Sequence, residues 1–176
     1  MRGLLIFGWM MIAFSGHAQR VGVVSDMPNG TSAEIKALLA APVHYGRYAE
    51  MGRVRVELRG VYIESGLLWL VFRGINRSAI DFRPATMRIA IRDKHAFRRR
   101  ALQERSLPLL VGYEPSVLRA DSAVLFCYGL TPRVPGRRQE IFIEWMERNG
   151  DRRLLLHVPA SAVLTARKIV ASAQKN

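Results

Sequence analysis

The sequence has one cysteine, few carboxylates and few aromatic side chains, and the shortage of cysteine already excludes a class of protein. A single cysteine among 176 residues cannot close an intramolecular disulfide, which excludes a secreted scaffold built on disulfides. Cys127 stands in the apolar run 123–128, so we interpret it as a small buried residue of a strand rather than a reactive thiol. The domain must therefore be held together by an ordinary apolar core.

The chain also lacks the motifs of common active sites. His44, His95 and His157 lie far apart and match no zinc-binding spacing. No phosphate-binding glycine loop, dinucleotide-binding fingerprint or nucleophile elbow occurs. The carboxylates mostly stand beside arginines, as Glu57 does, which is typical of cross-strand ion pairs rather than of a general acid and base. We expect no enzyme, no metal, no cofactor and no small-molecule substrate; a hydrolase would need convergent carboxylates in a pocket.

Positive charge is plentiful. Lys and Arg number 27 against 14 Asp and Glu, giving a formal net charge of +13, which attracts anionic partners. The basic clusters 98–100 and 137–138 fit either a phosphate-binding patch or a loop that docks onto an acidic protein. We favour protein docking, chiefly because an exported chain rarely meets DNA, and also because Phe97 is the only aromatic residue adjacent to the first cluster. A basic binder of nucleic acid or of an anionic membrane surface stays the alternative.

The N-terminus has the pattern of an export signal. Arg2 precedes an apolar stretch over 4–14, and Gly16 and Ala18 supply the small residues of a cleavage site. An uncleaved anchor is the alternative, but polar residues from Ser15 onward end the apolar stretch early. We predict a signal peptide over 1–18, a flexible lead-in and short helix over 19–43, and a β-sandwich-like domain over 44–172.

Hydrophobic periodicity predicts one helix near each end of the mature chain. The spacing of Thr31 and Glu34 is that of a capping box, and an apolar face follows until Pro42 ends the helix. After Pro159, a second apolar face indicates an amphipathic terminal helix. The residues of that second face are Val163, Ala166, Ile169 and Val170.

The remaining periodicity is that of strands. Residues 53–59 alternate strictly, and Gly60 breaks the alternation as a bulge would. The run 67–72 is apolar on both faces, which indicates a fully buried strand. Asn149-Gly150 is the strongest hairpin signal and favours a type I′ turn. Further strands are expected at 61–63, 87–91, 122–128, 141–145 and 154–158.

These elements favour a mainly β fold. Several hairpins and short connections argue for an antiparallel β-sandwich or open barrel with a short N-terminal helix and a C-terminal helix, because parallel strands need longer crossovers. The polar segment 93–104 is expected to be a connection with one helical turn capped by Asp93. Two triplets, at 29–31 and 76–78, match the short glycosylation pattern, which also arises by chance.

A series of short motifs resembles a known family. In order along the chain, the motifs are residues 60–63, 67–72, 76–80, 91–94, 98–101, 103–104, 107–109, 147–150 and 153–154. As an ordered set they resemble the C-terminal region of the TraN family of Bacteroidetes conjugative transposons, over about residues 44–170. Family members are longer, with an additional N-terminal domain, and residues 130–138 depart from the strand that the family has there.

The resemblance implies a function. It implies a periplasmic structural component of a conjugative type IV secretion apparatus, near the outer membrane, whose partners are other subunits of that apparatus. Contact with DNA is not required for such a role. On this basis we expect docking through the basic connection and its flanks, and changing its three central arginines to serine should impair assembly without unfolding. The expected docking residues are Arg92, Asp93, Lys94, Arg98, Arg99, Arg100, Gln103 and Glu104.

Overall fold

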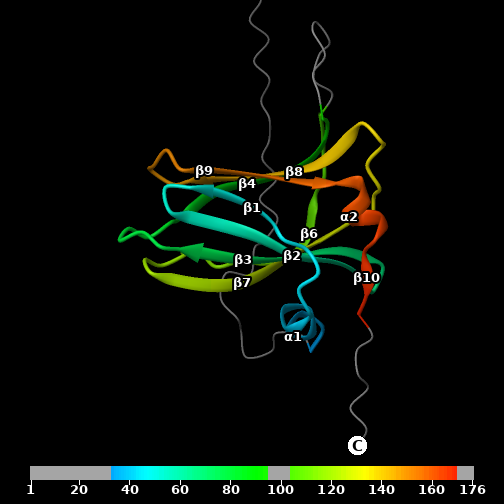
Figure 1. Cartoon of the computed structure of the whole chain (residues 1–176), viewed down its shortest axis with the longest axis horizontal. Helices are drawn as coiled ribbons and strands as arrows, with labels where there is room; N and C mark the ends of the chain where they lie inside the picture. The colour runs from blue at the N-terminus through cyan, green and yellow to red at the C-terminus, as the bar shows by residue number, and fades with distance from the viewer. Residues whose placement is uncertain (1–32, 95–103, 170–176) are drawn as a thin grey trace, which may run out of the picture.

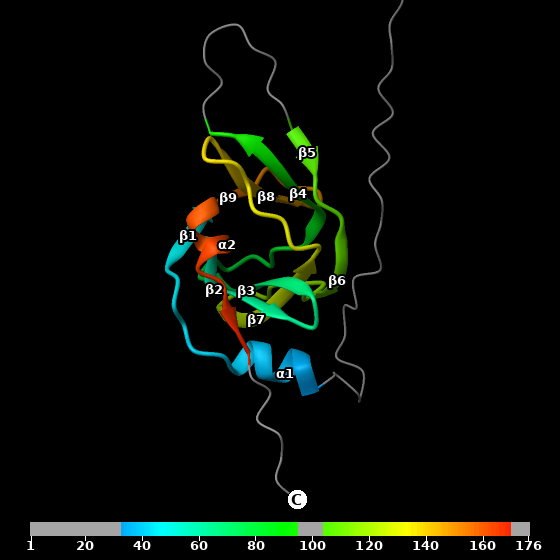
Figure 2. The same cartoon turned by 90° about the vertical axis from the view of Figure 1, so that its right-hand side faces the viewer.

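The computed structural model describes residues 33–94 and 104–169. In this part of the chain two antiparallel sheets pack face to face, with one short helix against the first sheet and another beside the edge of the sandwich (Figure 1). Viewed from the side, the second sheet forms the upper layer and α1 lies beneath the lower one (Figure 2). The expected fold class, mainly β with a helix near each end, is confirmed.

The first sheet has the strand order β1-β2-β3-β7-β6, and β10 pairs in parallel with β2. Its strands are β1 (Arg47–Met51), β2 (Val54–Glu64), β3 (Leu67–Asn76), β6 (Leu109–Tyr113), β7 (Ser122–Leu130) and β10 (Arg167–Lys168). The second sheet has the order β5-β4-β8-β9. Its strands are β4 (Pro84–Asp93), β5 (Glu104–Ser106), β8 (Gln139–Glu147) and β9 (Arg153–Pro159), and the two helices are α1 (Ala33–Ala40) and α2 (Ala160–Leu164).

The sandwich core contains the inward residues that alternation predicts. Val54, Val56 and Leu58 of β2 face inward and are almost fully buried, and the gap between Leu58 and Gly60 in the register confirms the predicted bulge. A Cβ at Gly60 would lie 2.6 Å from the Tyr62 ring, so only glycine fits there. The other inward strands contribute Ile89, Ile91, Ile141, Ile143, Trp145, Leu154, Leu156 and Val158.

β3 is buried on both faces, as its continuous apolar run predicts. Leu68, Leu70 and Phe72 face the second sheet, whereas Trp69 and Val71 face α1. Cys127 of β7 lies under α1 as well and has no exposed surface, which confirms its interpretation as a buried strand residue. The helix therefore explains why this strand lacks the polar alternation of a sheet with one wet face.

The hairpin between β8 and β9 exists, but its turn differs from the predicted type I′. Asn149 has a positive φ of 57°, whereas Gly150 is not among the residues with positive φ. Residues 148–152 separate the two strands, so the loop is longer than two residues. Glycine is suited to position 150 because a Cβ there would collide with the carboxylate of Glu147. That carboxylate pairs with Arg152, so an ion pair rather than a tight turn shapes the loop.

The C-terminal helix is shorter than its periodicity predicts. α2 ends at Leu164, and the Thr165 hydroxyl donates to the Ser161 carbonyl, 2.9 Å away. The chain then becomes extended, and Arg167 and Lys168 pair with Tyr62 and Ile63 of β2. β1 pairs only with residues 54–58 of β2, so the remaining edge of β2 is open to β10. Pairing with a free strand edge has overridden the helical pattern.

Arg152 joins three loops at one end of the sandwich. Its guanidinium forms an ion pair with Glu147 and donates to the Asp81 carbonyl at 2.7 Å and the Ser78 hydroxyl at 3.2 Å. It also lies 5.4 Å above the Phe82 ring, and its stem lies where a side chain at Gly52 would be. The side chain is 16% exposed, so these contacts are largely screened from water.

Asn76 closes the same loop region. Its side-chain amide donates to the carbonyls of Ile80 and Leu118 at 2.9 and 3.0 Å, and its oxygen accepts from the Ser78 backbone and hydroxyl. The residue is 1% exposed. Both amide hydrogens are thus engaged, and the triplet 76–78 is a loop closure rather than an accessible glycosylation site in the folded domain.

A buried polar chain crosses the core. The indole N–H of Trp145 donates to the Tyr128 hydroxyl at 2.9 Å, and that hydroxyl hydrogen-bonds with Glu114, which is 7% exposed. Burial raises the pKa of Glu114 to about 7, and the hydrogen bond from Tyr128 opposes this shift. Burial also raises the pKa of Tyr128 well above its usual value. The carboxyl therefore changes charge near neutral pH inside the core.

Candidate docking surface

The outer face of the second sheet carries alternating arginines and glutamates. In β4, Arg88 and Arg92 point away from the core because Ile89 and Ile91 point inward. Across the sheet the outward residues of β8 and β9 lie opposite them. These residues are Glu140, Phe142, Glu144, Arg153 and His157.

Arg92 is held in a compact cluster on this face. Its guanidinium lies 3.9 Å above the Phe142 ring, and its Nε lies 3.7 Å from the Glu140 carboxylate. The same carboxylate lies 2.6 Å from Nδ1 of His157, whose ring contacts Phe142 edge-on. Phe142 is only 1% exposed although it points outward. Cation–π stacking therefore makes Arg92 part of the packing of this face.

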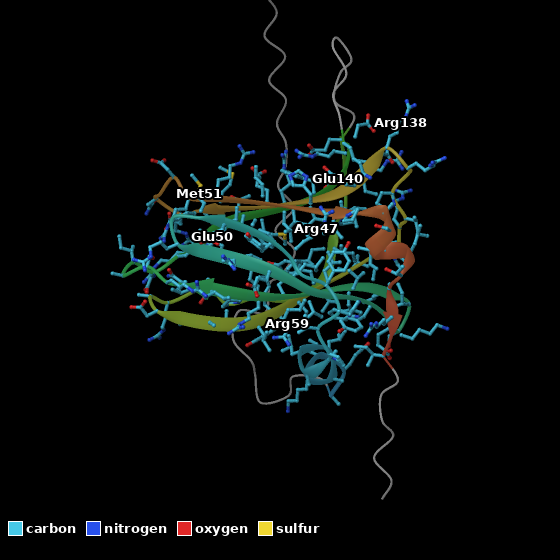
Figure 3. All side chains as sticks on the ribbon, in the orientation of Figure 1. Arg47, Glu50, Met51, Arg59, Arg138 and Glu140 are labelled. Carbon is cyan, nitrogen blue, oxygen red and sulfur yellow. The ribbon has the colours of Figure 1, made fainter. Side chains whose placement is uncertain are left out.

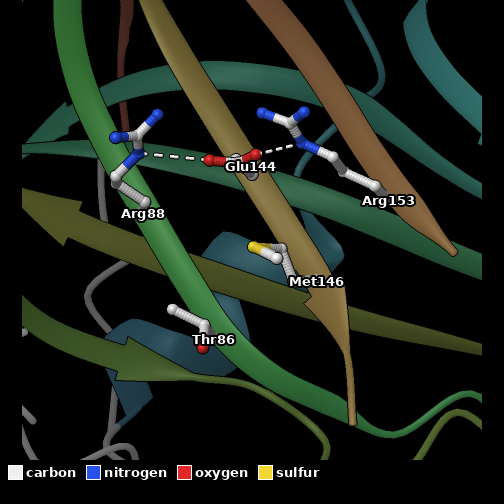
Figure 4. Close-up of a pocket in the computed structure, with 5 residues that line it drawn as sticks. All are labelled: Thr86, Arg88, Glu144, Met146 and Arg153. Carbon is white, nitrogen blue, oxygen red and sulfur yellow. Dashed lines mark hydrogen bonds and ion pairs between the residues drawn. The ribbon is translucent and has the colours of Figure 1, made fainter. Parts of the chain in front are cut away.

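Glu144 lies between two arginines at the other half of the face. Its carboxylate is 3.1 Å from Nε of Arg88 and also pairs with Arg153 (Figure 4). Together with Thr86 and Met146 these side chains line an open pocket of about 390 Å³. Glu144 is 4% exposed, whereas the arginines are half exposed, so one buried carboxylate at the pocket floor faces two arginines. The pocket is a cross-strand ion-pair network of the kind predicted from the neighbouring Arg and Glu residues.

The structure describes four of the expected docking residues. Arg92 lies in the cluster above, and Asp93 ends β4 and accepts a hydrogen bond at 3.3 Å from Gln139. Asp93 is therefore the last residue of a strand, and the helical turn that it was expected to cap lies outside the described residues. Glu104 begins β5 opposite Arg92 and forms an ion pair at 3.1 Å with Arg88.

Lys94 is the fourth described docking residue and the one that stays free. Its side chain is exposed and has no ion-pair partner among residues 33–94 and 104–169. Its backbone N–H donates to the carbonyl of Arg138 at 2.8 Å, which brings the basic pair Arg137 and Arg138 beside it. Arg98, Arg99, Arg100 and Gln103 lie outside the described residues.

Lys94, Arg137 and Arg138 together form a basic end, which is the described part of the candidate docking surface. All three side chains are exposed, and none has an ion-pair partner in the described part of the chain. Arg138 lies at the end of the molecule where β8 begins, close to Glu140 (Figure 3). Of the nearby carboxylates, Glu140 pairs with Arg92 and His157, and Asp93, which accepts from the neutral Gln139 amide, offsets only one of the three positive charges. Uncompensated positive charge therefore gathers at this end.

The sequence did not single out the Phe142 cluster. His157 was expected on the strand surface, which is where it lies, but its contact with Glu140 was not foreseen. The sequence feature that could have predicted this cluster is an aromatic residue at an outward position of β8, between two glutamates that lie opposite arginines of β4. Among the described residues no group of three or more His, Cys, Asp or Glu could hold a metal ion.

Comparison with known families places this domain. A family model described as "domain of unknown function (DUF4138)" matches residues 45–168. The chain belongs to this family. The DUF4138 match contains every strand of both sheets and leaves out α1. No curated protein matches the chain. None of the described helices is long and apolar enough to cross a lipid bilayer.

Proposed function

We propose that this DUF4138 protein is an exported, periplasmic structural component of a conjugative type IV secretion apparatus, which acts by assembling with other subunits. The resemblance to the TraN family supports this, and it covers nearly the same residues, 44–170, as the DUF4138 match. The export pattern at residues 1–18 supports a periplasmic location. The proposal assigns the protein a docking role and no catalysis.

The observation that carries the docking role is the unneutralised charge of Lys94, Arg137 and Arg138. On the outer face of the same sheet, by contrast, Arg88 and Arg153 share Glu144, and Arg92 pairs with Glu140. Cations that outnumber the carboxylates around them attract an acidic surface and raise the rate of association with it. A rigid β-sandwich that holds them at one end presents them together, as docking requires.

The experiment compares two triple variants in co-purification from the envelopes of donor cells. K94S/R137S/R138S removes the basic end, and we expect it to reduce recovery of partner subunits about tenfold while the unfolding midpoint stays unchanged. R53S/R77S/R148S is the matched control, because it removes the same charge from exposed arginines at the opposite ends of the strands. Equal recovery of partners with both variants would contradict the proposal.

The alternative function is binding of nucleic acid or of an anionic membrane surface, and the net charge of +13 favours it. Such binding weakens steeply with salt because counterions are released. Titration with a DNA duplex and with phosphatidylserine vesicles, at low and at physiological salt, separates the two functions. Tight salt-dependent binding that K94S/R137S/R138S abolishes, without any protein partner in the envelope, would replace the docking proposal by this alternative.

A further inference from the structure

The outer face of the first sheet carries an apolar surface that α1 covers (Figures 1 and 2). Leu38 of α1 is completely buried against it. The surface comes from three neighbouring strands, and each of its residues is at most 3% exposed. These residues are Tyr62, Trp69, Val71 and Cys127, and we call them the α1 seat.

The contact between α1 and its seat is centred on Leu38, with Ile35 and Leu39 packed beside it and partly buried. Leu38 is the one fully buried residue of the eight in this helix. The chain is fixed again directly after the helix, because the Tyr62 hydroxyl donates to the Pro42 carbonyl at 2.6 Å and the His44 N–H donates to Arg59. Movement about Ala41 would therefore release the helix without breaking these contacts. The α1 seat lies within the DUF4138 match, which begins at residue 45, whereas α1 lies outside it.

The helix leaves polar atoms of the interface unpaired. The indole Nε1 of Trp69 and the Oε1 atom of Glu34 are both buried, and neither has a hydrogen-bond partner among the described residues. A buried donor without an acceptor is unfavourable, since it has lost its bond to water. A helix that placed a carboxylate or amide oxygen against Trp69 would fit the seat better than α1 does.

The rim of the α1 seat is positively charged. Arg59 precedes Tyr62 on β2 and Arg73 follows Val71 on β3, whereas Arg167 and Lys168 of β10 lie opposite Tyr62 and Ile63. None of these four side chains has an ion-pair partner in the described part of the chain. Burial raises the pKa of Tyr62, and the charges of Arg167 and Arg59 oppose that shift. The rim thus complements an acidic occupant.

We propose that the α1 seat is the docking site of an acidic amphipathic helix from a partner protein, and that α1 occupies the site until the partner arrives. Helices bind such apolar grooves through residues spaced three and four apart, as Ile35, Leu38 and Leu39 are in α1. Because α1 competes for the site, weakening α1 strengthens binding of the partner. This inference concerns a different surface from the basic end of Lys94, Arg137 and Arg138, and it does not depend on the proposed function.

The test uses Cys127, the only cysteine of the chain, as a reporter of the seat. In the free protein its thiol is buried and its pKa is raised to about 12 by burial, so it should react slowly with a disulfide reagent such as DTNB. Leu38→Ala should speed this reaction about tenfold or more, because the anchor of α1 is lost. Leu164→Ala is the matched control, since this leucine of α2 is 68% exposed.

The binding probe is a synthetic twelve-residue helical peptide with leucines at the α1 spacing and glutamates elsewhere, paired with a second peptide in which lysine replaces glutamate. We expect the acidic peptide to bind the L38A protein about tenfold more tightly than the unchanged protein, and the basic peptide not to bind. Binding of the acidic peptide should again protect Cys127 from DTNB.

Four results would overturn the inference. Equal reaction rates of Cys127 in L38A and L164A would mean that α1 does not guard the seat. Equal binding of both peptides would remove the acidic helix as occupant. Loss of the cooperative unfolding transition in L38A would mean that α1 is an inseparable part of the core. Dimerisation of L38A would mean that a second copy of this chain, rather than a partner protein, occupies the seat.

Discussion

Replacing Glu114 by glutamine should remove a large part of the pH dependence of stability. The carboxyl of Glu114 is buried beside the Tyr128 hydroxyl, and burial raises its pKa from 4.5 to about 7. Glutamine has nearly the same shape and keeps an oxygen that accepts from Tyr128, but it carries no charge at any pH. The substitution therefore isolates the cost of ionising this one buried group.

The magnitude follows from the shift in pKa. A folded-state pKa above the unfolded value means that the folded state binds the extra proton, so stability is greatest at low pH and falls as pH rises through about 7. At about 1.4 kcal/mol per pKa unit, the shift from 4.5 to about 7 corresponds to about 3 kcal/mol in total. Between pH 5 and pH 8 about 2.5 kcal/mol of this free energy of unfolding is lost.

Urea unfolding followed by tryptophan fluorescence at pH 5 and pH 8 measures this loss. The unchanged protein should lose about 2.5 kcal/mol more than E114Q between the two pH values. Asp151→Asn in the exposed β8–β9 loop is the control and should behave as the unchanged protein does. Parallel pH profiles for E114Q and the unchanged protein would refute the claim that Glu114 ionises in the core.

Two further substitutions test the packing of the sandwich. Arg152→Ala should lower the free energy of unfolding by about 3 kcal/mol, because it leaves the Glu147 carboxylate without its partner, and Arg152→Lys should recover less than half of that loss. Urea titration measures both variants. A loss below about 1 kcal/mol in Arg152→Ala would count against Arg152 as the residue that joins the three loops. Phe142→Ala should lower the free energy of unfolding by about 3 kcal/mol although Phe142 lies on an outer face, since Arg92 and His157 bury its ring. A change within about 0.5 kcal/mol, measured by differential scanning calorimetry, would show that the ring is solvated.

Alternation predicted the strands because burial on one face of a sheet imposes a period of two. The strict pattern of residues 53–59 and the glycine after it gave β2 and its bulge. The apolar run at 67–72 likewise gave the central strand, since α1 and the second sheet each cover one of its faces. These signals are local, so they can be read from the sequence.

The features that escaped prediction depend on residues far apart in the chain. The helical pattern at the C-terminus gave way to β10 because β1 leaves part of the β2 edge unpaired, and the pattern itself carries no sign of that edge. The alternation of inward and outward residues along β8 predicts that Phe142 is exposed. Only the pairing register between β4 and β8 brings Arg92 above its ring. Glu114 has no local signature of burial either.

The candidate site was predicted in composition more than in geometry. The sequence singled out Lys94 together with Arg92 and Asp93, but neighbouring strands then bind Arg92 and Asp93 and leave Lys94 free. The nearness of Arg138 to Lys94 arises from a backbone hydrogen bond between two connections separated by β5, β6 and β7. Positive charge along the chain is visible in the sequence, whereas its neutralisation depends on strand pairing.

The measurement that tests the central claim most directly is the apparent mass of the tagged full chain after gentle detergent extraction of donor-cell envelopes, read by native gel and mass photometry. If the protein is an assembly subunit of a periplasmic apparatus, it should be recovered from the envelope in complexes several times heavier than the 19.9 kDa chain. Recovery as a free chain, or from the cytoplasmic fraction alone, would contradict the account.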